Sequence, residues 1–375
     1  MLSLGRRSSY APSLEVVERK GMGHPDTLCD HLAESLARQL SSLMMKRTGG
    51  MGHFNVDKGL LVAGEADVRP GGGRIREPAR VILAGRVDLE ALGTGPTELT
   101  GLLEEDLARS LPAAPLGAVK LELQVNRPAA DLADLTIGLH GAPLANDTSF
   151  AVVSLPRTPL EETVHRVTDH LNDATTLERL PIGTDVKVMG HRENHRTGLI
   201  VAAPVLAERV SGERSYRAVV AEVEREVSRV AGEVAGDVPE IRVNAAPGLY
   251  LSLIGSSAEA GDDGEVGRGN DFGGLIAPMR PRSGEAPAGK NPVSHVGKIY
   301  HAMAHDMADR LVGVAGEVTV GLLSRIGAPV SEPVVARVDT LEPVNEERVA
   351  AVVRDVLHDW EGVRNRLLEG HYELY

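Results

Sequence analysis

Segments that read as strands come in pairs along this 375-residue chain, and segments that read as helices lie between the pairs. Apolar and polar residues alternate in the expected strands, whereas apolar residues recur every three or four positions in the expected helices. A doubly wound parallel sheet requires strands and helices to alternate regularly, and the sequence lacks that pattern. We therefore predict an α+β fold whose sheets are antiparallel.

The most regular helix is expected over residues 25–45, where Leu28, Leu32, Leu36 and Leu40 form one apolar stripe. Further helices are expected over 159–172, 216–234, 296–311 and 345–368, and over 88–111 with a turn at Gly93–Pro96. Strands are expected over 53–68, 80–87, 119–125, 135–139, 150–155, 185–190, 198–205, 241–244 and 250–254, with two short strands within 317–339.

Charge and cysteine content narrow the class of protein. The formal net charge of −13 argues against nucleic acid or an anionic membrane as the main partner. The single cysteine, Cys29, excludes an intrachain disulfide and a cysteine-only zinc site, and it fits a cytoplasmic location. No apolar run approaches the roughly 18 residues that a membrane span needs, and no secretory signal is visible.

The glycine-rich stretch 259–300 concentrates the groups that a polyphosphate site needs. Its glycines let the backbone approach a ligand closely, and Asp262 and Asp263 are hard oxygen donors that suit Mg²⁺ or a ligand ammonium. The side chains that suit phosphate oxygens are Arg268, Lys290, His295 and Lys298. We expect this stretch to form the phosphate-binding part of an active site.

A second candidate anion site is the sequence 21–26, which turns into the helix expected over 25–45. Pro25 suits the first helical position, and the dipole of a helix favours an anion near its N-terminus. His24 and Asp26 could hold a phosphate and its Mg²⁺ there. The same residues would equally suit an ordinary capped helix.

Three further motifs have simpler interpretations. Residues 284–290 spell G-x-x-x-x-G-K, but Asn291 replaces the Ser or Thr of a P-loop. His301 and His305 lie four positions apart without the glutamate of a zinc protease, so we interpret them as solvated histidines on a helix face. His191 and His195 fall in a polar turn and are interpreted in the same way.

Several segments together are similar to one enzyme family. They are VERKGMGHPDTLCDHLAES at 17–35, PLANDTSF at 143–150, DVKVMG at 185–190, SSAEAGDDGEVGRGN at 256–270, AGKNPVSHVGKIY at 288–300 and LLSRIGAPVSEP at 322–333. In this order they resemble the archaeal-type branch of S-adenosylmethionine synthetase (methionine adenosyltransferase), a transferase of one-carbon metabolism. The resemblance spans nearly the whole chain.

The resemblance implies a fold, an assembly and a reaction. The fold would be three similar α+β subdomains around a pseudo-threefold axis, forming one functional unit over 1–375 with approximate cores 14–115, 116–235 and 236–375. A homodimer would place the active sites at its interface. Methionine sulfur would attack the 5′ carbon of ATP, and the displaced triphosphate would be hydrolysed to phosphate and pyrophosphate. Mg²⁺ and K⁺ are the implied cofactors.

The resemblance also assigns roles to residues that match the family motifs. The implied triphosphate ligands are His24, Lys187, Arg268, Lys290, His295 and Lys298. Asp26 and Asp263 would hold Mg²⁺, and Asp262 or Asp263 would meet the methionine ammonium or the ribose. The remaining nucleotide and amino-acid contacts would come from Glu18, Glu65, Asn146 and Asp147.

One loop departs from the family pattern. Where the family carries a glycine- and glutamine-containing loop that shapes the amino-acid pocket, this chain has Asn126-Arg127-Pro128-Ala129-Ala130-Asp131-Leu132. Three hypotheses therefore stay open from the sequence. The chain is an ordinary synthetase with a divergent loop, an enzyme that uses the same ATP chemistry with another small acceptor, or a non-catalytic subunit of such an enzyme.

Overall fold

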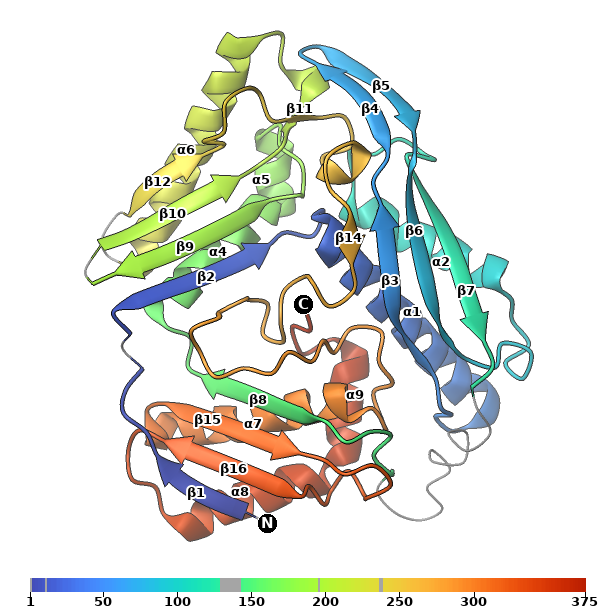
Figure 1. The fold of residues 1–375 in the computed structure, drawn as a ribbon, viewed down its shortest axis with the longest axis vertical. Coiled ribbons are helices and arrows are strands. Elements are labelled where there is room, and N and C mark those ends of the chain that lie inside the picture. The colour runs from blue at the N-terminus through green and yellow to red at the C-terminus, as the bar shows by residue number, and fades with distance from the viewer. Residues whose placement is uncertain (1, 11, 129–142, 195, 236–238) are drawn as a thin grey trace.

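A computed structural model describes residues 2–10, 12–128, 143–194, 196–235 and 239–375 (Figure 1). Within these ranges the chain forms three four-stranded sheets. The first sheet has the order β8 (Phe150–Leu155), β15 (Val318–Leu323), β16 (Val335–Thr340), β1 (Leu2–Arg6). The second has the order β2 (Leu14–Lys20), β9 (Lys187–Glu193), β10 (Arg196–Ala202), β12 (Glu240–Val243). The third has the order β14 (Gly264–Glu265), β3 (Asn55–Val62), β6 (Ala79–Arg86), β7 (Val119–Asn126).

The three sheets share one pairing pattern. In each sheet the first two pairings are antiparallel, and the last strand joins in parallel at the edge. The parallel edge strands were not predicted, because strand direction depends on a crossover that local sequence does not record. The predicted α+β class, with three similar and mainly antiparallel units, is confirmed.

Each sheet is covered by helices and has its own hydrophobic core. Helices α1 (Pro25–Thr48) and α2 (Pro96–Ser110) lie on the third sheet, and α4 (Pro159–Asn172) and α6 (Glu213–Ala235) on the second. Helices α7 (Val296–Ala315), α8 (Glu346–His358) and α9 (Trp360–Glu369) cover the first. The short helix α5 (Ala174–Arg179) and the strand pairs β4 (Glu65–Arg69) with β5 (Gly72–Glu77) and β11 (Val205–Leu206) with β13 (Leu251–Ser252) complete the fold.

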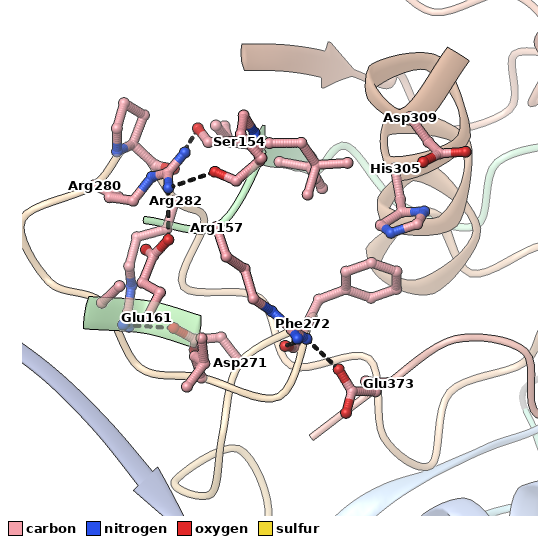
Figure 2. A pocket seen from close by; sticks show the side chains of 18 of the residues that line it. Ser154, Arg157, Glu161, Asp271, Phe272, Arg280, Arg282, His305, Asp309 and Glu373 are labelled. Atoms are coloured by element: carbon pink, nitrogen blue, oxygen red, sulfur yellow. Dashed lines mark hydrogen bonds and ion pairs between the residues drawn. The ribbon is translucent and has the colours of Figure 1, made fainter. Parts of the chain in front are cut away.

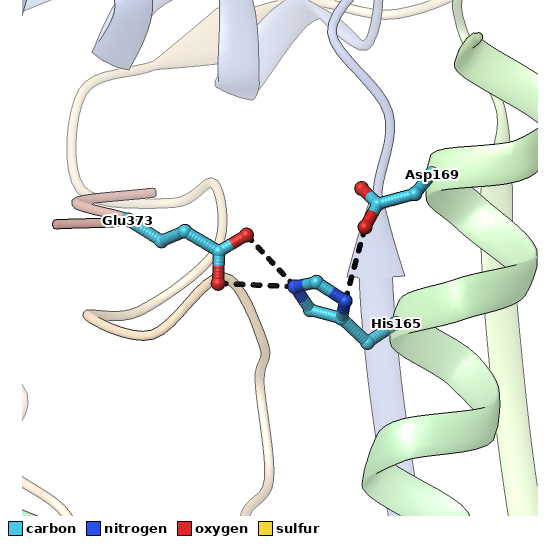
Figure 3. Close-up of side chains that lie close together, drawn as sticks. All are labelled: His165, Asp169 and Glu373. Carbon is cyan, nitrogen blue, oxygen red and sulfur yellow. Dashed lines mark hydrogen bonds and ion pairs between the residues drawn. The ribbon is translucent and has the colours of Figure 1, made fainter. Parts of the chain in front are cut away.

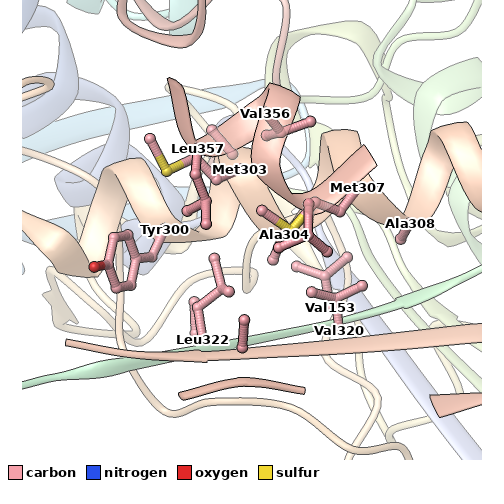
Figure 4. Packing of buried hydrophobic residues seen from close by; sticks show 14 of the residues in the cluster. Val153, Tyr300, Met303, Ala304, Met307, Ala308, Val320, Leu322, Val356 and Leu357 are labelled. Atoms are coloured by element: carbon pink, nitrogen blue, oxygen red, sulfur yellow. The ribbon is translucent and has the colours of Figure 1, made fainter. Parts of the chain in front are cut away.

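Figure 4 shows the core between α7 and the first sheet. Tyr300, Met303 and Met307 lie on one face of α7 and pack against strand residues such as Val320 and Leu322, and all five are buried. The predicted leucine stripe of α1 is confirmed on the third sheet, because Leu28, Leu32, Leu36 and Leu40 are all 0% exposed. Helical spacing of apolar residues therefore set which face of each helix is buried.

The chain passes cyclically between the three units. Strand β2 belongs to the second sheet, but the helix that follows it, α1, packs on the third. Likewise β8 of the first sheet leads into α4 on the second, and β14 of the third leads into α7 on the first. Three connectors, 21–24, 156–158 and 266–295, therefore cross from one unit to another in the middle of the molecule (Figure 1). The three approximate core ranges stay a prediction.

Several predicted element boundaries were wrong for local reasons. The stretch expected to be helical over 88–111 with a turn at Gly93–Pro96 is helical only from Pro96, because Gly93 has a positive φ of 58° and Gly95 is the N-cap. The turn is confirmed, and the helix expected before it was wrong. The expected terminal helix over 345–368 is split at Asp359 into α8 and α9. The expected strand 53–68 is two strands, β3 and β4, with a break before Glu65. The expected strand 135–139 lies outside the described residues.

Across the described ranges, no helix combines the length and the apolarity that crossing a membrane requires.

Candidate active site

The connector between β2 and α1 is a tight glycine turn that packs against the second unit. Gly23 donates a backbone hydrogen bond to the Thr184 carbonyl at 3.0 Å. A Cβ on Gly23 would lie 2.3 Å from the Thr184 hydroxyl and 2.7 Å from the Asp185 amide nitrogen. The turn therefore needs glycine at this position, which places the start of α1 directly beside the strand that carries Lys187.

His24 is the N-cap of α1, and its ring nitrogen Nδ1 accepts a hydrogen bond from the Asp26 amide at 3.2 Å. Burial, followed by the charge of Lys20, lowers the pKa of His24 to about 4. The imidazole is therefore neutral at pH 7. Because Nδ1 accepts, the proton lies on Nε2, which is the atom left to donate to an anion.

Charged side chains gather around this turn, and we call Glu18, Lys20, His24, Asp26 and Lys187 the turn group. The Lys20 ammonium lies 3.0 Å from an Asp26 carboxylate oxygen and 3.6 Å from Glu18. The Lys187 ammonium lies 3.4 Å from Glu18. Lys20 was missed by sequence reasoning, although its position directly before the glycine turn was a usable signal.

The acidic residues of the glycine-rich stretch adjoin the turn group. Burial, Asp26 and Asp263 raise the pKa of Asp262, which places these three carboxylates near one another. Asp263 accepts a hydrogen bond from the Ala63 amide at 2.8 Å. The exposed Arg268 side chain makes no hydrogen bond or ion pair within the described ranges, while the Arg268 carbonyl accepts from Lys20.

A second cluster surrounds the start of α7, and we call Asp57, Glu285, Lys290 and His295 the α7 group. His295 is the N-cap of α7, and its Nδ1 accepts from the Gly297 amide at 3.2 Å. Burial, followed by the charge of Lys290, lowers the pKa of His295 to about 3. Lys290 forms a close ion pair with Glu285 and lies 4.0 Å from Asp57.

The same cap therefore occurs in two of the three connectors. His24 and His295 each cap a helix through Nδ1 and each lie beside a lysine. In the third connector the N-cap of α4 is Thr158, whose amide is bound by Glu161 of the same helix in a capping box. Two helix N-termini thus offer an uncharged N–H donor to an anion, and the third is closed by its own carboxylate.

The other predicted residues lie at differing depths. Asn146 accepts a hydrogen bond from the Val296 amide at 3.3 Å and so contacts the first turn of α7. Asp147 and Glu65 are exposed. Lys298 is 1% exposed and lies behind the α7 group. Within the described residues, no hydrogen bond or ion pair joins the turn group to the α7 group.

An acidic stripe on α1 was missed by sequence reasoning. Asp26, Asp30 and Glu34 are spaced four apart and accept hydrogen bonds from the amides of Glu265, Gly267 and Gly289 respectively. Burial raises the pKa of Asp30 to about 7. The stripe binds the glycine-rich stretch along α1, and the i, i+4, i+8 spacing of acidic residues was the signal for it.

Asp185, the first residue of the DVKVMG segment, was also missed. Its carboxylate accepts from the Ser257 amide at 2.7 Å and from the Ser257 hydroxyl at 2.6 Å. Burial raises its pKa to about 6. Asp185 thereby fixes the residues that lead into the glycine-rich stretch against the strand that carries Lys187.

The interpretation of His301 as a solvated histidine was wrong. His301 is 2% exposed, its Nε2 lies 2.5 Å from the Ser283 hydroxyl, and its Nδ1 lies 2.9 Å from the Gly297 carbonyl. The face of α7 that carries it is covered by the connector 266–295, which the helical spacing alone could not reveal. His305 is half-buried and lies beside Phe272.

A cavity of about 550 Å³ lies away from both groups, between the first and second units (Figure 2). Its three arginines are paired with carboxylates, since Arg280 bonds Glu161, Arg282 bonds Asp271 and Arg157 bonds Glu373. None of the predicted site residues lines it.

Comparison with known proteins shows the family of the chain. The family model described as S-adenosylmethionine synthetase (AdoMet synthetase) matches residues 3–371. The S-adenosylmethionine synthase of Aeropyrum pernix is 40% identical over 376 residues, covering 95% of this chain and 91% of that protein. The S-adenosylmethionine synthase of Haloquadratum walsbyi is 37% identical, covering 95% of this chain and 93% of that protein.

A solved structure shares the fold. It is an unusual S-adenosylmethionine synthetase from Campylobacter jejuni, with a TM-score of 0.63 at 15% identity, covering 94% of this chain and 88% of that one. The family model and the relatives span nearly the whole chain, including both helix N-termini. The chain belongs to the S-adenosylmethionine synthetase family.

Proposed function

We propose that this protein makes S-adenosylmethionine from ATP and methionine, as a methionine adenosyltransferase. The sulfur of methionine attacks the 5′ carbon of ATP, the C5′–O bond breaks, and the triphosphate leaves with the bonding electrons. The triphosphate is then hydrolysed to phosphate and pyrophosphate. The observation that carries this proposal is the pair of helix N-termini, each capped by a neutral histidine beside a lysine.

This geometry suits the charge that develops in the reaction. Negative charge accumulates on the leaving triphosphate in the transition state, so fixed donors aimed at that charge lower the barrier. We assign the Nε2–H groups of His24 and His295 and the ammonium groups of Lys187 and Lys290 to that role, with Arg268 as an exposed cation beside them. No covalent nucleophile is needed, because proximity and alignment of the sulfur and C5′ supply the remaining acceleration.

The carboxylates near the turn group fit Mg²⁺ bound to a polyphosphate. Asp26, Asp262 and Asp263 are hard oxygen donors close to one another. Among the described residues, three potential ligand atoms lie within 4.8 Å of one another at His165, Asp169 and Glu373, and the oxygens of the three aspartates near the turn group do not all lie that close together. Magnesium on a nucleotide takes one or two protein carboxylates and completes its shell with phosphate and water oxygens, so a loose carboxylate set suits it. When bound, Mg²⁺ would neutralise phosphate charge.

A homodimer that completes each active site at its interface is part of the proposal. Each sheet exposes a large apolar side chain: Phe150 of β8 is 49% exposed, Ile200 of β10 is 46% and Leu60 of β3 is 47%. Exposed apolar side chains on flat sheets suit packing against a second copy. Within the described ranges no hydrogen bond or ion pair joins the turn group to the α7 group, so we propose that a second copy supplies further phosphate-binding residues between them. We further propose a cytoplasmic location.

The relatives favour methionine as the acceptor over the two other hypotheses. Two relatives that each cover 95% of this chain are both named S-adenosylmethionine synthase. Arg127, the arginine of the divergent loop, forms ion pairs with Asp88 and Glu90. Most of the remainder of that loop lies outside the described residues, so the loop offers no separate argument for another acceptor.

The testing experiment is a product assay of the purified protein with ATP, Mg²⁺ and K⁺. We expect S-adenosylmethionine, phosphate and pyrophosphate in equal amounts, measured by mass spectrometry and phosphate release. Reactions without methionine, Mg²⁺ or K⁺ serve as controls, each of which should lower product formation. Cleavage of ATP that ignores methionine would instead support another acceptor, and the absence of any turnover would support a non-catalytic subunit.

Substitution Lys290→Ala tests the site itself. We expect turnover to fall by about 10²-fold or more, because one fixed positive donor to the transition state is lost. The conservative variant Lys290→Arg should recover part of the rate. An unchanged turnover in Lys290→Ala would remove Lys290 from the leaving-group site.

A further inference from the structure

Lys298 was expected to contact phosphate, but its ammonium is buried and hydrogen-bonded within the protein. It lies on the first turn of α7 and its side chain is 1% exposed. Its Nζ donates to a Glu34 carboxylate oxygen at 2.5 Å and to the Lys290 carbonyl at 2.7 Å. Burial lowers its pKa from the ordinary lysine value, while Glu34 acts in the opposite direction. Lys298 therefore holds the backbone of Lys290, the residue whose side chain belongs to the α7 group.

Glu34 holds the other end of the same short segment. Its side chain is 6% exposed, and the oxygen that accepts from Lys298 also accepts from the Gly289 amide at 3.1 Å. The two-residue segment Gly289–Lys290 is thus bonded at both ends, through the Gly289 N–H to Glu34 of α1 and through the Lys290 carbonyl to Lys298 of α7. These helices cover different units of the fold, so one buried ion pair connects both units to Lys290.

The backbone at this point has little freedom to find another arrangement. Gly289 has a positive φ of 73°, and a Cβ there would lie 2.5 Å from the Val56 carbonyl oxygen. The Gly289 carbonyl accepts from the Val56 amide at 3.0 Å, and Lys290 bridges to Asn55 of β3. A shift of this peptide would therefore move the Lys290 ammonium away from Asp57 and Glu285, the two carboxylates that it faces.

We infer that Glu34 and Lys298 are a positioning pair, which sets the Lys290 ammonium at the start of α7 for the leaving triphosphate. The inference rests on the proposed function. A buried ion pair adds little net stability over apolar residues of similar volume, so its main effect here is expected on geometry. Lys298 then acts through Lys290 and does not touch the substrate.

A double-mutant cycle separates this role from direct phosphate contact. The variants are Lys298→Met, Lys290→Ala and the combination of the two, with kcat and KM for methionine and ATP measured for each. If Lys298 acts through Lys290, we expect Lys298→Met to lower kcat by about 10- to 100-fold with little change in KM for methionine. The combined variant should then be no slower than Lys290→Ala alone, within about 3-fold. Losses that multiply would overturn the inference and restore direct contact.

The matched control is Arg280→Met, which breaks another buried ion pair. Arg280 and Glu161 are each 6% exposed, and within the described residues neither forms a hydrogen bond or ion pair with the α7 group. We expect kcat of Arg280→Met to stay within about 3-fold of the wild type at temperatures where the protein is folded. An equal loss of kcat in Lys298→Met and Arg280→Met would mean that only stability was measured, and would overturn the inference. If Lys298→Met does not fold, the double variant Glu34→Gln/Lys298→Met, which removes both charges of the pair, is used in place of the single variant.

Hydrogen exchange provides a readout that does not depend on turnover. The amides of residues 288–291 should exchange faster in Lys298→Met than in the wild type, and Arg280→Met should leave them unchanged. Unchanged exchange at these amides would contradict the positioning role even if turnover fell. Wild-type protein that makes no S-adenosylmethionine would contradict the proposed function, and the exchange result would still decide whether the pair holds Lys290.

Discussion

At the scale of single residues, the cap histidines combine a structural and a chemical task. The Nδ1 atom of His24 accepts the Asp26 amide, which leaves Nε2–H as the only ring donor. We predict that His24→Asn lowers turnover by about 10²-fold while leaving the melting temperature nearly unchanged, because Asn is a strong N-cap but does not place a donor at the Nε2 position. Kinetics and thermal unfolding measure the two effects. A large fall in melting temperature, or full activity, would contradict this division of tasks.

The two histidines also predict a pH dependence of stability. Their pKa values lie near 4 and 3 when folded, below the ordinary value of about 6.5. The unfolded chain therefore binds more protons between these values, so stability falls as pH drops below about 6.5. Each histidine adds a slope of up to roughly 1.4 kcal/mol per pH unit. Denaturant unfolding between pH 7.5 and 5 should show a smaller slope in the variant with both His24→Asn and His295→Asn than in the wild type.

At the scale of elements, the glycine turn before α1 depends on a contact with another unit. We predict that Gly23→Ala lowers turnover by more than about 10²-fold and destabilises the protein, because the new Cβ would overlap Thr184 and the Asp185 amide. The control is Gly101→Ala in α2, where a Cβ would meet nothing within 4 Å. That change should stabilise the protein by about 0.5–1 kcal/mol. Thermal unfolding and turnover of both variants provide the test.

Element prediction from the sequence succeeded where local chemistry decides the outcome. Pro159 and Asn172 were predicted as the ends of a helix and are the ends of α4, where Thr158 and Glu161 form a capping box. The break at Asp359 was missed, because the apolar periodicity continues through it. His301 was misplaced, because its face of α7 is covered by the connector 266–295 and periodicity within a helix carries no information about what covers it.

At the scale of the whole molecule, the C-terminal tail joins segments from different units (Figure 3). The Glu373 carboxylate lies 2.8 Å from His165 of α4 and 3.4 Å from Arg19 of β2, and it also bonds Arg157. The Tyr375 hydroxyl lies 2.8 Å from His31 of α1. Two arginines on the same carboxylate favour an ion-pair cluster over a metal site at His165, Asp169 and Glu373.

We predict that Glu373→Gln destabilises the protein by about 1 kcal/mol at pH 6, since the carboxylate is partly exposed and its ion pairs are screened. Its hydrogen bond with His165 and the nearby arginines hold the pKa of Glu373 at about 2. The stabilisation is therefore present above its ordinary pKa of about 4.5 and is lost as pH falls toward 2. The control Glu369→Gln, in an exposed pair with His371, should change stability by less than about 0.5 kcal/mol. Equal effects of the two variants would contradict the role of the tail.

The proposed dimer gives a prediction for the assembled molecule. Ile200→Asp places a charge on the exposed face of the second sheet, so we expect the dimer dissociation constant to rise by at least about 10-fold, with turnover lost in the monomer. Leu116→Asp is the control, because Leu116 is fully exposed outside the sheets. Sedimentation or light scattering measures the assembly. A monomeric wild type with full turnover would contradict the proposed interface site.

The sequence by itself determined the family, because six local motifs carry the resemblance, and the buried face of α1, because leucines recur there every four positions. Only the tertiary structure decided that the chain crosses to another unit after β2, β8 and β14, that the acidic stripe of α1 binds the glycine-rich stretch, and that Lys298 bonds Glu34 across 264 positions of sequence. Such contacts depend on how the three units pack against one another and against the connectors between them. Local periodicity and turn chemistry do not encode that packing.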